Sequence, residues 1–225
     1  MLVLGIDTSG KSGGVTLAQT DDRSFRVLGS AVIAGGTFSA QLVPTIAALL
    51  KASNLGPHDL EGFAAVSGPG SFTGLRVGLS AVKGLAEVLH KPIATVSVLE
   101  MLASLFRENG KIVGALDAGR SEIFFGLYEV RNEIATQKAE RLVSESEFIC
   151  EINKPGIAAV ITSDPRIEQV AATAQTKAEL LERPSSEHAA RIGARKLLTG
   201  ENVAIEALDA NYLRRSDAEM FKGQH

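Results

Sequence analysis

The sequence predicts an α/β protein made of two related halves, each with a mixed sheet flanked by helices. Short apolar runs of strand length alternate with longer segments of helical periodicity, and a strand, acidic turn and strand occur twice. We therefore expect a first subdomain over residues 1–109 and a second over residues 110–225, divided at Asn109-Gly110. A last helix, about 185–199, is expected to pack back on the first half.

Composition and charge are those of an ordinary globular chain. Its 225 residues are 45% hydrophobic and 22% charged, which suffices for a sizeable core. The net charge of −3 provides no general positive field for nucleic acid. Cys150 is the only cysteine, and no apolar run reaches the roughly 18 residues of a membrane span. Because the start also lacks the basic segment of a signal peptide, we expect a cytoplasmic protein without a membrane partner.

The most informative segment, residues 63–89, reads FAAVSGPGSFTGLRVGLSAVKGLAEVL. A short apolar strand runs into a glycine-rich turn, and a helix follows, capped by Ser71 or Thr73. The turn comprises Ser67, Gly68, Pro69, Gly70, Ser71, Thr73 and Gly74.

The helix after this turn has only a narrow polar stripe. Gly74, Gly78 and Ala81 lie on one side, where small side chains let another backbone approach closely. One apolar row can cover a sheet, and the other needs a second helix from this chain or from a partner. Two interpretations follow: a helix that only builds the core, or one that also offers a partner surface. The polar stripe consists of Arg76, Ser80, Lys83, Glu87 and His90.

The first turn matches a phosphate-binding motif in letters only. Residues 5–12, GIDTSGKS, satisfy G-x-x-x-x-G-K-[ST], but that motif must deliver its lysine onto the first turn of a helix. Two glycines and two β-branched residues follow instead, so we predict a β-hairpin. A third strand is expected over 24–34, and a helix capped by Ser39 with Pro44 near its first turn.

The second half repeats the pattern of the first. A strand over 112–117 ends in Asp117 and a return strand covers 123–130, while 133–139 and 158–162 are further strands. Helices are expected near 145–150, from Pro165 to about 174 after an Asp164 cap, and after Ser185 or Ser186. In the first half, a strand over 92–96 and a helix over 98–106 complete the expected elements.

Both acidic turns have groups that bind phosphate. Backbone N–H groups of such a turn can hold an anion, while the carboxylate holds hydrated magnesium. Two such hairpins resemble the actin-like (ASKHA, ribonuclease H-like) architecture of actin, sugar kinases and Hsp70. Asp7, Thr8 and Ser9, with Asp117, are thus either a vestigial nucleotide or phosphate turn or simple hairpin chemistry.

Four segments together resemble the TsaB (YeaZ) family: MLVLGIDTS, SGPGSFTGLRVGLSAVKGLA, PIATVSVLEMLA and DANYLRR. The resemblance implies an actin-like fold and a non-catalytic role in forming threonylcarbamoyladenosine beside the tRNA anticodon. It also implies a catalytic paralogue, TsaD, as partner, and a TsaE-type ATPase docking nearby. Transfer RNA would be contacted mainly through the complex, and the chain alone would form a homodimer.

The paralogue carries two metal-binding histidines in a segment of the form H-x-E-G-H. The matching segment here is Val98-Leu99-Glu100-Met101-Leu102, whose first and last residues cannot ligate a metal. Glu100 is then expected to be solvated or to act in capping. We predict no catalytic residue and no metal site, and no cofactor of the chain's own; ATP or ADP with magnesium would enter only in the complex.

The resemblance also implies that the first two helices form a helical-bundle interface, which agrees with the surplus apolar row. The predicted interface residues are Leu42, Ile46, Leu49, Leu75, Leu79, Val82 and Leu85. Two alternatives stay open. In the first alternative, the chain is an actin-like kinase or ATPase that uses Asp7 and Asp117 with magnesium. Such enzymes usually have a Gly-Gly turn for adenosine in the second half, but the last 72 residues lack an adjacent glycine pair. Alternatively Ser67 or Ser71 is a nucleophile, although G-x-S-x-G is not met around Ser71.

Overall fold

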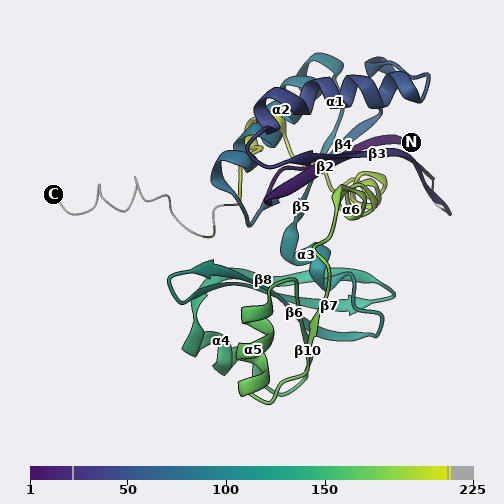
Figure 1. Ribbon diagram of the computed structural model, residues 1–225. Coiled ribbons are helices and arrows are strands. Elements are labelled where there is room, and N and C mark those ends of the chain that lie inside the picture. Colours follow the sequence, from purple (N-terminus) through teal and green to yellow (C-terminus); the bar gives the residue numbers. More distant parts are fainter. Residues whose placement is uncertain (22, 212, 214–225) are drawn as a thin grey trace. The chain divides into compact units, whose positions relative to one another are not determined.

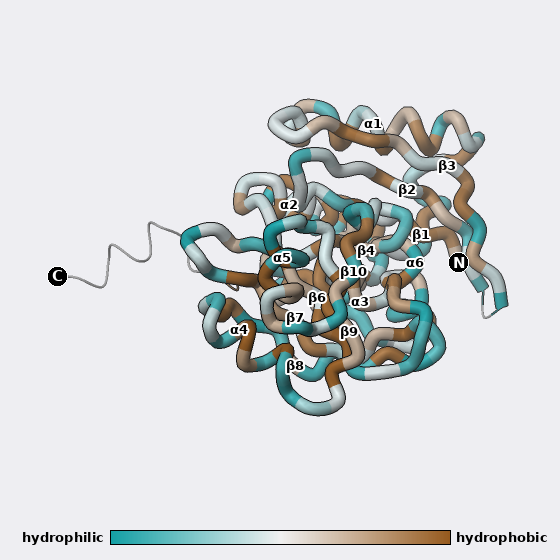
Figure 2. Tube along the Cα trace, turned by 60° about the horizontal axis from the view of Figure 1, so that its bottom comes forward, coloured by the Kyte–Doolittle hydropathy of each residue, from teal (hydrophilic) through white to brown (hydrophobic). Residues whose placement is uncertain are grey.

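The structure is a computed structural model, and it describes residues 1–21, 23–211 and 213. The chain forms two compact units (Figure 1). The first unit comprises Met1–Val98 together with Pro184–Asn211, and the second comprises Leu99–Arg183. Each unit contains a five-stranded mixed sheet, and Figure 2 shows hydrophobic stretches within strands of both sheets.

The sheet of the first unit has the strand order β3-β2-β1-β4-β5. The first strand pairs antiparallel with the second and parallel with the fourth, so the predicted hairpin at the start of the chain is confirmed. The predicted third strand is also present. The five strands are β1 (Leu2–Asp7), β2 (Ser12–Thr20), β3 (Phe25–Ala34), β4 (Gly62–Gly68) and β5 (Ile93–Ser97).

Helices cover both faces of this sheet. On one face lie α1 (Phe38–Ala52) and α2 (Phe72–Leu89), and on the other lies α6 (Ser186–Leu198) (Figure 1). The last helix lies very close to the strands, because a Cβ atom added at Gly193 would come within 2.2 Å of the Ala64 Cβ. Two short 3-10 turns, Pro57–Asp59 and Ile205–Ala207, complete the first unit.

The sheet of the second unit repeats the first. Its order, β10-β9-β6-β7-β8, is the same arrangement read from the other edge, with the first strand antiparallel to the second and parallel to the fourth. The edge strand β10 was not predicted, because three residues show no periodicity. The strands are β6 (Gly110–Gly119), β7 (Glu122–Arg131), β8 (Ile134–Ser144), β9 (Ile157–Thr162) and β10 (Ala178–Leu180).

The helices of the second unit are shorter. Phe148 of α4 (Glu145–Ile152) and Ile167 of α5 (Pro165–Thr173) pack into the core of the sheet around Phe125. The third helix, α3 (Val98–Ala103), contacts the sheet through Leu99, whose carbonyl oxygen would lie 2.6 Å from a Cβ added at Gly114. It ends three residues before the expected end.

Two local predictions were wrong. The first helix begins at Phe38, so Ser39 lies inside it and does not cap it. The preceding Thr37 hydroxyl donates a hydrogen bond to the Ala34 carbonyl oxygen (2.7 Å), within the turn. Pro44 lies in the interior of α1 rather than near its first turn, and it is exposed. Of the expected polar tail, Tyr212 and residues 214–225 lie outside the described residues.

Candidate functional site

The acidic turn after β1, residues Asp7, Thr8 and Ser9, is called the Asp7 turn below. The Asp7 carboxylate oxygen Oδ1 accepts hydrogen bonds from the Ser9 backbone nitrogen (2.8 Å) and from Ser9 Oγ (2.5 Å). All three residues are buried. An aspartate side chain that accepts a hydrogen bond from the backbone N–H two residues later is common in turns. The carboxylate is therefore engaged inside the turn.

Helix α2 lies directly against the Asp7 turn. The Ser71 backbone nitrogen donates to the Ser9 carbonyl oxygen (2.8 Å). A Cβ atom added at Gly74 would lie 2.1 Å from the Thr8 carbonyl oxygen, and one added at Gly78 would lie 2.2 Å from Thr8 Oγ1. The prediction that the small side of this helix admits a second backbone is confirmed, and that backbone belongs to the same chain. Because the helix occupies this space, α2 packs closely against the Asp7 turn.

The glycine turn connects β4 to α2 through a cis peptide bond between Gly68 and Pro69. Ser71 is the N-cap residue of the helix, and its Oγ accepts a hydrogen bond from the Gly74 backbone nitrogen (3.2 Å). The prediction of a cap is confirmed for Ser71 rather than Thr73. Ser67 is buried, and its carbonyl oxygen accepts from the Asn211 nitrogen (2.8 Å). Both serines thus take part in the structure of the turn.

Asp117 holds the equivalent place in the second unit, with different partners. Its Oδ1 accepts from the Gly119 backbone nitrogen (3.0 Å) and from Arg166 Nη1 (2.7 Å). Arg166 also donates through Nη2 to Glu145 Oε2 (2.5 Å), so one guanidinium joins two carboxylates. The Asp117 side chain is half-buried. Each acidic turn is therefore engaged within its own unit.

The segment that corresponds to the paralogue's histidine motif begins α3. Val98 and Leu102, at the two histidine positions, are both fully buried. Glu100 is also buried, so the expectation that it is solvated was wrong. It lies in the first turn of the helix three residues after Ser97, which is the spacing of a capping box. Across the described part of the chain, no three His, Cys, Asp or Glu side chains gather as metal ligands would.

The structure brings the seven predicted interface residues together on α1 and α2. Most of them belong to the core of their own unit, because both helices turn these side chains toward the sheet and toward each other. Leu49 and Leu85 are half-buried. The buried residues are Leu42, Ile46, Leu75, Leu79 and Val82.

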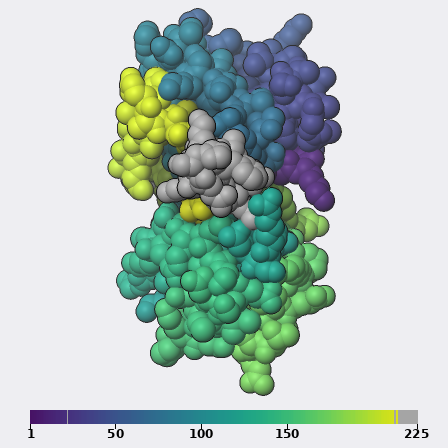
Figure 3. All heavy atoms as spheres, turned by 90° about the vertical axis from the view of Figure 1, so that its left-hand side faces the viewer, coloured from purple at the N-terminus to yellow at the C-terminus, as the bar shows by residue number. Residues whose placement is uncertain are grey.

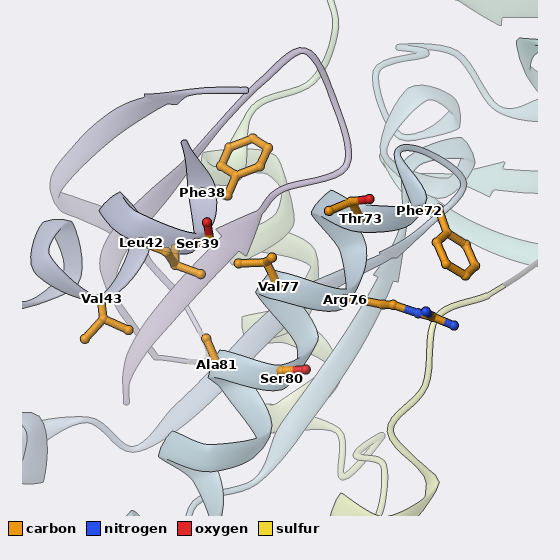
Figure 4. Close-up of a pocket in the computed structure, with 10 residues that line it drawn as sticks. All are labelled: Phe38, Ser39, Leu42, Val43, Phe72, Thr73, Arg76, Val77, Ser80 and Ala81. Carbon is orange, nitrogen blue, oxygen red and sulfur yellow. The ribbon is translucent and has the colours of Figure 1, made fainter. Parts of the chain in front are cut away.

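An open groove of about 510 Å³ runs between the two helices and is called the α1–α2 groove below. In Figure 4, Leu42 and Val77 point toward each other from the two helices. Val43, at one side of the groove, is 57% exposed, and Phe72, at the start of α2, is 36% exposed. The lining residues are Phe38, Ser39, Leu42, Val43, Phe72, Thr73, Arg76, Val77, Ser80 and Ala81.

The groove is mainly apolar, with hydroxyl groups and one charge. The Arg76 guanidinium carbon lies 3.8 Å above the centre of the Phe72 ring. Further along the same helix, Val88 is 74% exposed. Figure 3 shows that the atoms of α1 and α2 lie side by side on the surface of the first unit. The two helices therefore expose apolar side chains where each could contact another molecule.

The exposed residues Val43 and Phe72 were missed by sequence reasoning, whereas Val88 belongs to the apolar row of α2 that was expected to need a second helix. The sequence signal that could have found Val43 is its position directly beside Leu42, which lies in the buried row of α1. An apolar residue at such a position lies at the boundary between the core and the surface.

The chain was compared with known proteins. The family model described as TsaD, tRNA N6-adenosine threonylcarbamoyltransferase, matches residues 32–208. The Bacillus subtilis (strain 168) protein named tRNA threonylcarbamoyladenosine biosynthesis protein TsaB is 34% identical over 138 residues, covering 61% of this chain and 59% of the relative. The Escherichia coli (strain K12) protein of that name is 27% identical over 188 residues, covering 79% and 81%.

A solved structure shares the fold along nearly the whole chain. The structure described as YeaZ from Pseudomonas aeruginosa has a TM-score of 0.75 at 21% identity and covers 93% of this chain and 100% of its own. The alignments to the first two curated relatives, from Bacillus subtilis and Haemophilus influenzae, span only 59% and 52% of their lengths. None of the helices among the described residues has the length and apolar character to cross a membrane.

The repeated strand order and the helix-covered mixed sheets define an actin-like (ASKHA, ribonuclease H-like) fold with two related subdomains. Within that class, the chain belongs to the family that the TsaD model describes, in its TsaB (YeaZ) branch.

Proposed function

We propose that the protein is a non-catalytic subunit that takes part in forming N6-threonylcarbamoyladenosine next to the tRNA anticodon. In this proposal it dimerises with a TsaD-type catalytic paralogue and activates it. The observation that carries the proposal is the α1–α2 groove, where apolar side chains are exposed on two long neighbouring helices. Apolar surface of this kind, rimmed by polar groups, is typical of protein–protein interaction sites.

The acidic turns support a docking role over catalysis. The Asp7 carboxylate is buried and accepts two hydrogen bonds from Ser9. The Asp117 carboxylate accepts hydrogen bonds from Gly119 and Arg166, so both carboxylates are engaged within their own units. Val98 and Leu102 occupy the positions where the resemblance implies metal-binding histidines in the paralogue. The reaction would then take place on the paralogue.

The interface that we propose combines predicted and missed residues. Leu42 contributes to the floor of the groove, while the buried Leu75, Leu79 and Val82 hold α2 on the sheet. The direct contacts would come from residues that reach the surface. These are Val43, Phe72, Val77, Ala81 and Val88, with Leu49 and Leu85 at the margins.

The remaining partners follow the same proposal. Without the paralogue, two copies of the chain would pair through the α1–α2 groove. A TsaE-type ATPase would join the complex, bringing ATP or ADP and magnesium, and tRNA would be bound mainly by the other subunits because this chain has a net charge of −3. The assembly would work in the cytoplasm, with residues 1–109 supplying the partner-binding helices.

The test is a titration of a TsaD-type paralogue from the same organism with a Val43→Asp variant. Val43 is largely exposed, so an aspartate should be tolerated by the fold but should oppose burial in an interface. We expect at least about tenfold weaker binding, equal to about 1.4 kcal/mol. The matched control is Val32→Asp, an exposed valine of β3 outside the groove, which should bind like the wild type. Equal affinity for Val43→Asp and wild type would refute the proposed surface.

A second readout tests the non-catalytic role. The paralogue should modify tRNA faster when the wild-type chain is added, and the chain alone should show no modification. ATP binding by the isolated chain with steady turnover would instead support the kinase or ATPase alternative.

A further inference from the structure

We infer that the outer edge of β3 pairs with the same edge of a second copy of the chain, antiparallel and around a two-fold axis at Val32. The sheets of the two first units would then continue into one another. This contact is separate from the α1–α2 groove, because the groove is lined by residues of α1 and α2. The inference goes beyond the proposed function and does not depend on it.

The first observation is that three of the four sheet edges are closed to another strand. The β5 edge of the first sheet is covered, because the Val203 backbone nitrogen donates to the Ile93 carbonyl oxygen (2.9 Å) in a short antiparallel bridge. In the second sheet, β10 has only three residues, and β8 carries Lys138, Glu140 and Arg141. Short strands and charged side chains both prevent pairing between sheet edges.

The edge of β3 lacks this protection over its second half. Residues 27–37 contain no charged side chain and no proline. In Figure 1, β3 lies at the margin of its sheet, and within the described part of the chain no strand pairs with its outer side. Val32, in this stretch, is 84% exposed. A long, uncharged, apolar edge of this kind favours pairing with another strand.

The second observation is the direction of the backbone groups. The Gly35 nitrogen donates to the Lys11 carbonyl oxygen (2.9 Å), which sets which residues of β3 are hydrogen-bonded to β2. Because antiparallel pairs alternate between hydrogen-bonded and non-hydrogen-bonded residues, Ala31 and Ile33 direct their N–H and C=O groups toward β2. The alternate residues direct the same groups away from the sheet. These outward-facing residues are Ser30, Val32 and Ala34.

The position of the axis follows from the limits of the regular strand. Leu28 is the extra residue of a β-bulge in β3. An axis one or two residues before Val32 brings an outward-facing residue opposite Leu28 of the second copy, and an axis one or two residues after it brings one opposite Gly36 in the turn. An axis at Val32 pairs Ser30 with Ala34 of the second copy and allows about six main-chain hydrogen bonds.

The side chains in this register are compatible with close contact. Val32 lies opposite Gly14, where an added Cβ would lie 3.2 Å from Ser186 Oγ at the start of α6, so Val32 belongs to the α6 face of the sheet. The two Val32 side chains would cover each other there, because residues directly opposite in an antiparallel pair are neighbours. On the other face α1 contacts β3, and its residues 38–50 are uncharged.

A second copy fits this edge because of symmetry and charge. Two identical strands around a two-fold axis present the same donors and acceptors to each other, so the pair is closed and does not grow further. Like charges directly opposite would destabilise a strand pair, and residues 27–37 have none. One strand pair covers less than the roughly 1,200 Å² of a stable complex, so we expect a weak dimer with a Kd on the order of 10–100 µM.

The experiment measures self-association by sedimentation between about 5 µM and about 500 µM protein in a Val43→Asp background, which opposes pairing through the groove. Dimers should form in this background and persist with Val32→Thr, which keeps a β-branched side chain and the backbone N–H. Val32→Pro removes the outward N–H at an edge position that tolerates proline, so it should weaken self-association at least about tenfold. Equal thermal unfolding midpoints would show that both variants fold.

A pair of charge variants in the same background tests the axis itself. Copies with Val32→Lys, or copies with Val32→Asp, would place like charges opposite each other and should stay monomeric. An equimolar mixture of the two variants should dimerise, because each lysine would then face an aspartate. The mixture thus reports on which residue lies at the axis.

The contrary outcomes are distinct. A monomeric Val43→Asp background, or equal self-association of Val32→Pro and that background, would overturn the inference. A mixture of the charge variants that stays monomeric would overturn the axis at Val32. Weaker binding of the TsaD-type paralogue by Val32→Pro, with unchanged self-association, would identify an extended segment of another chain as the occupant and overturn the inference. The proposed function is tested separately, by the binding of the paralogue to Val43→Asp.

Discussion

The turns that follow β1 and β6 hold equivalent places in two sheets of the same strand order, but they are fixed by different chemistry. In the first unit, the Thr8 carbonyl oxygen lies against Gly74 of α2, and the Ser9 carbonyl oxygen lies against Gly70 of the glycine turn. In the second unit, the Asp117 carboxylate forms an ion pair with Arg166 near the start of α5. The shared fold thus tolerates either direct backbone contact or a bridge of side chains at this place.

The difference has a structural consequence for α2. Glycines inside a helix cost about 1 kcal/mol each relative to alanine, so α2 depends on the contacts that its glycines permit. A partly exposed ion pair contributes about 0–1 kcal/mol, so the pair between Arg166 and Asp117 is expected to add little to the stability of α5. The close packing against the Asp7 turn therefore fixes the position of α2, which supplies most of the residues that line the groove.

The outer surfaces of the helices differ in the same way. Val43, Phe72 and Val88 on α1 and α2 are exposed large apolar residues, whereas α4 and α5, as far as the structure describes them, expose no large apolar residue to a comparable extent. The helices of the two units thus differ in how much large apolar surface they expose.

The largest effect is expected from Gly74→Ala. The new Cβ would lie 2.1 Å from the Thr8 carbonyl oxygen, which belongs to the backbone and cannot rotate away. Overpacking of this kind should lower the free energy of unfolding by about 1–3 kcal/mol, measured by urea denaturation. The control is Gly84→Ala in the same helix, where a Cβ would meet no described atom within 4 Å. The free energy of unfolding of that variant should rise by about 0.5–1 kcal/mol. Equal losses for both variants would contradict the close packing of α2 against the Asp7 turn.

A smaller effect is expected from Arg166→Met in the second unit. This change removes the bridge to Asp117 and Glu145 but keeps a long apolar stem. Because all three side chains are partly exposed, the loss should be about 0.5–1 kcal/mol. A loss larger than that of Gly74→Ala would show that the second turn, not the first, depends more on its helix contact.

The smallest effect concerns pH and the start of α6. Burial is the main cause that lowers the pKa of His188, whose Nδ1 accepts a hydrogen bond from the Ser185 backbone nitrogen (3.2 Å). The unfolded chain then binds a proton more readily than the folded one. The free energy of unfolding should be constant above the ordinary histidine pKa of about 6.5 and should fall as the pH drops below it.

The matched variant for this prediction is His188→Gln, since glutamine also serves at this position of a capping box. Thermal unfolding measured between about pH 7.5 and about pH 5 should lose less stability in the variant than in the wild type. Identical pH profiles would show that His188 does not contribute to the pH dependence of stability.

The sequence predicted the strands well because apolar runs bounded by turns identify buried strands. It also predicted that a backbone would approach the small side of α2, although not that Thr8 supplies it. It could not separate core from surface on α1 and α2. Leu42 and Val43 are adjacent apolar residues, and only the placement of the neighbouring helix decides which one is exposed. The burial of Glu100 was also missed, because a charged residue near a helix start gives no local sign of burial.

The most direct test of the account is the rate of tRNA modification by the TsaD-type paralogue in the presence of wild type, Val43→Asp or Val32→Asp protein. We predict that wild type and Val32→Asp stimulate the paralogue equally at the same concentration, and that Val43→Asp needs at least about ten times more protein for the same rate. Full stimulation by Val43→Asp at the wild-type concentration would contradict the claim that the α1–α2 groove is the docking surface.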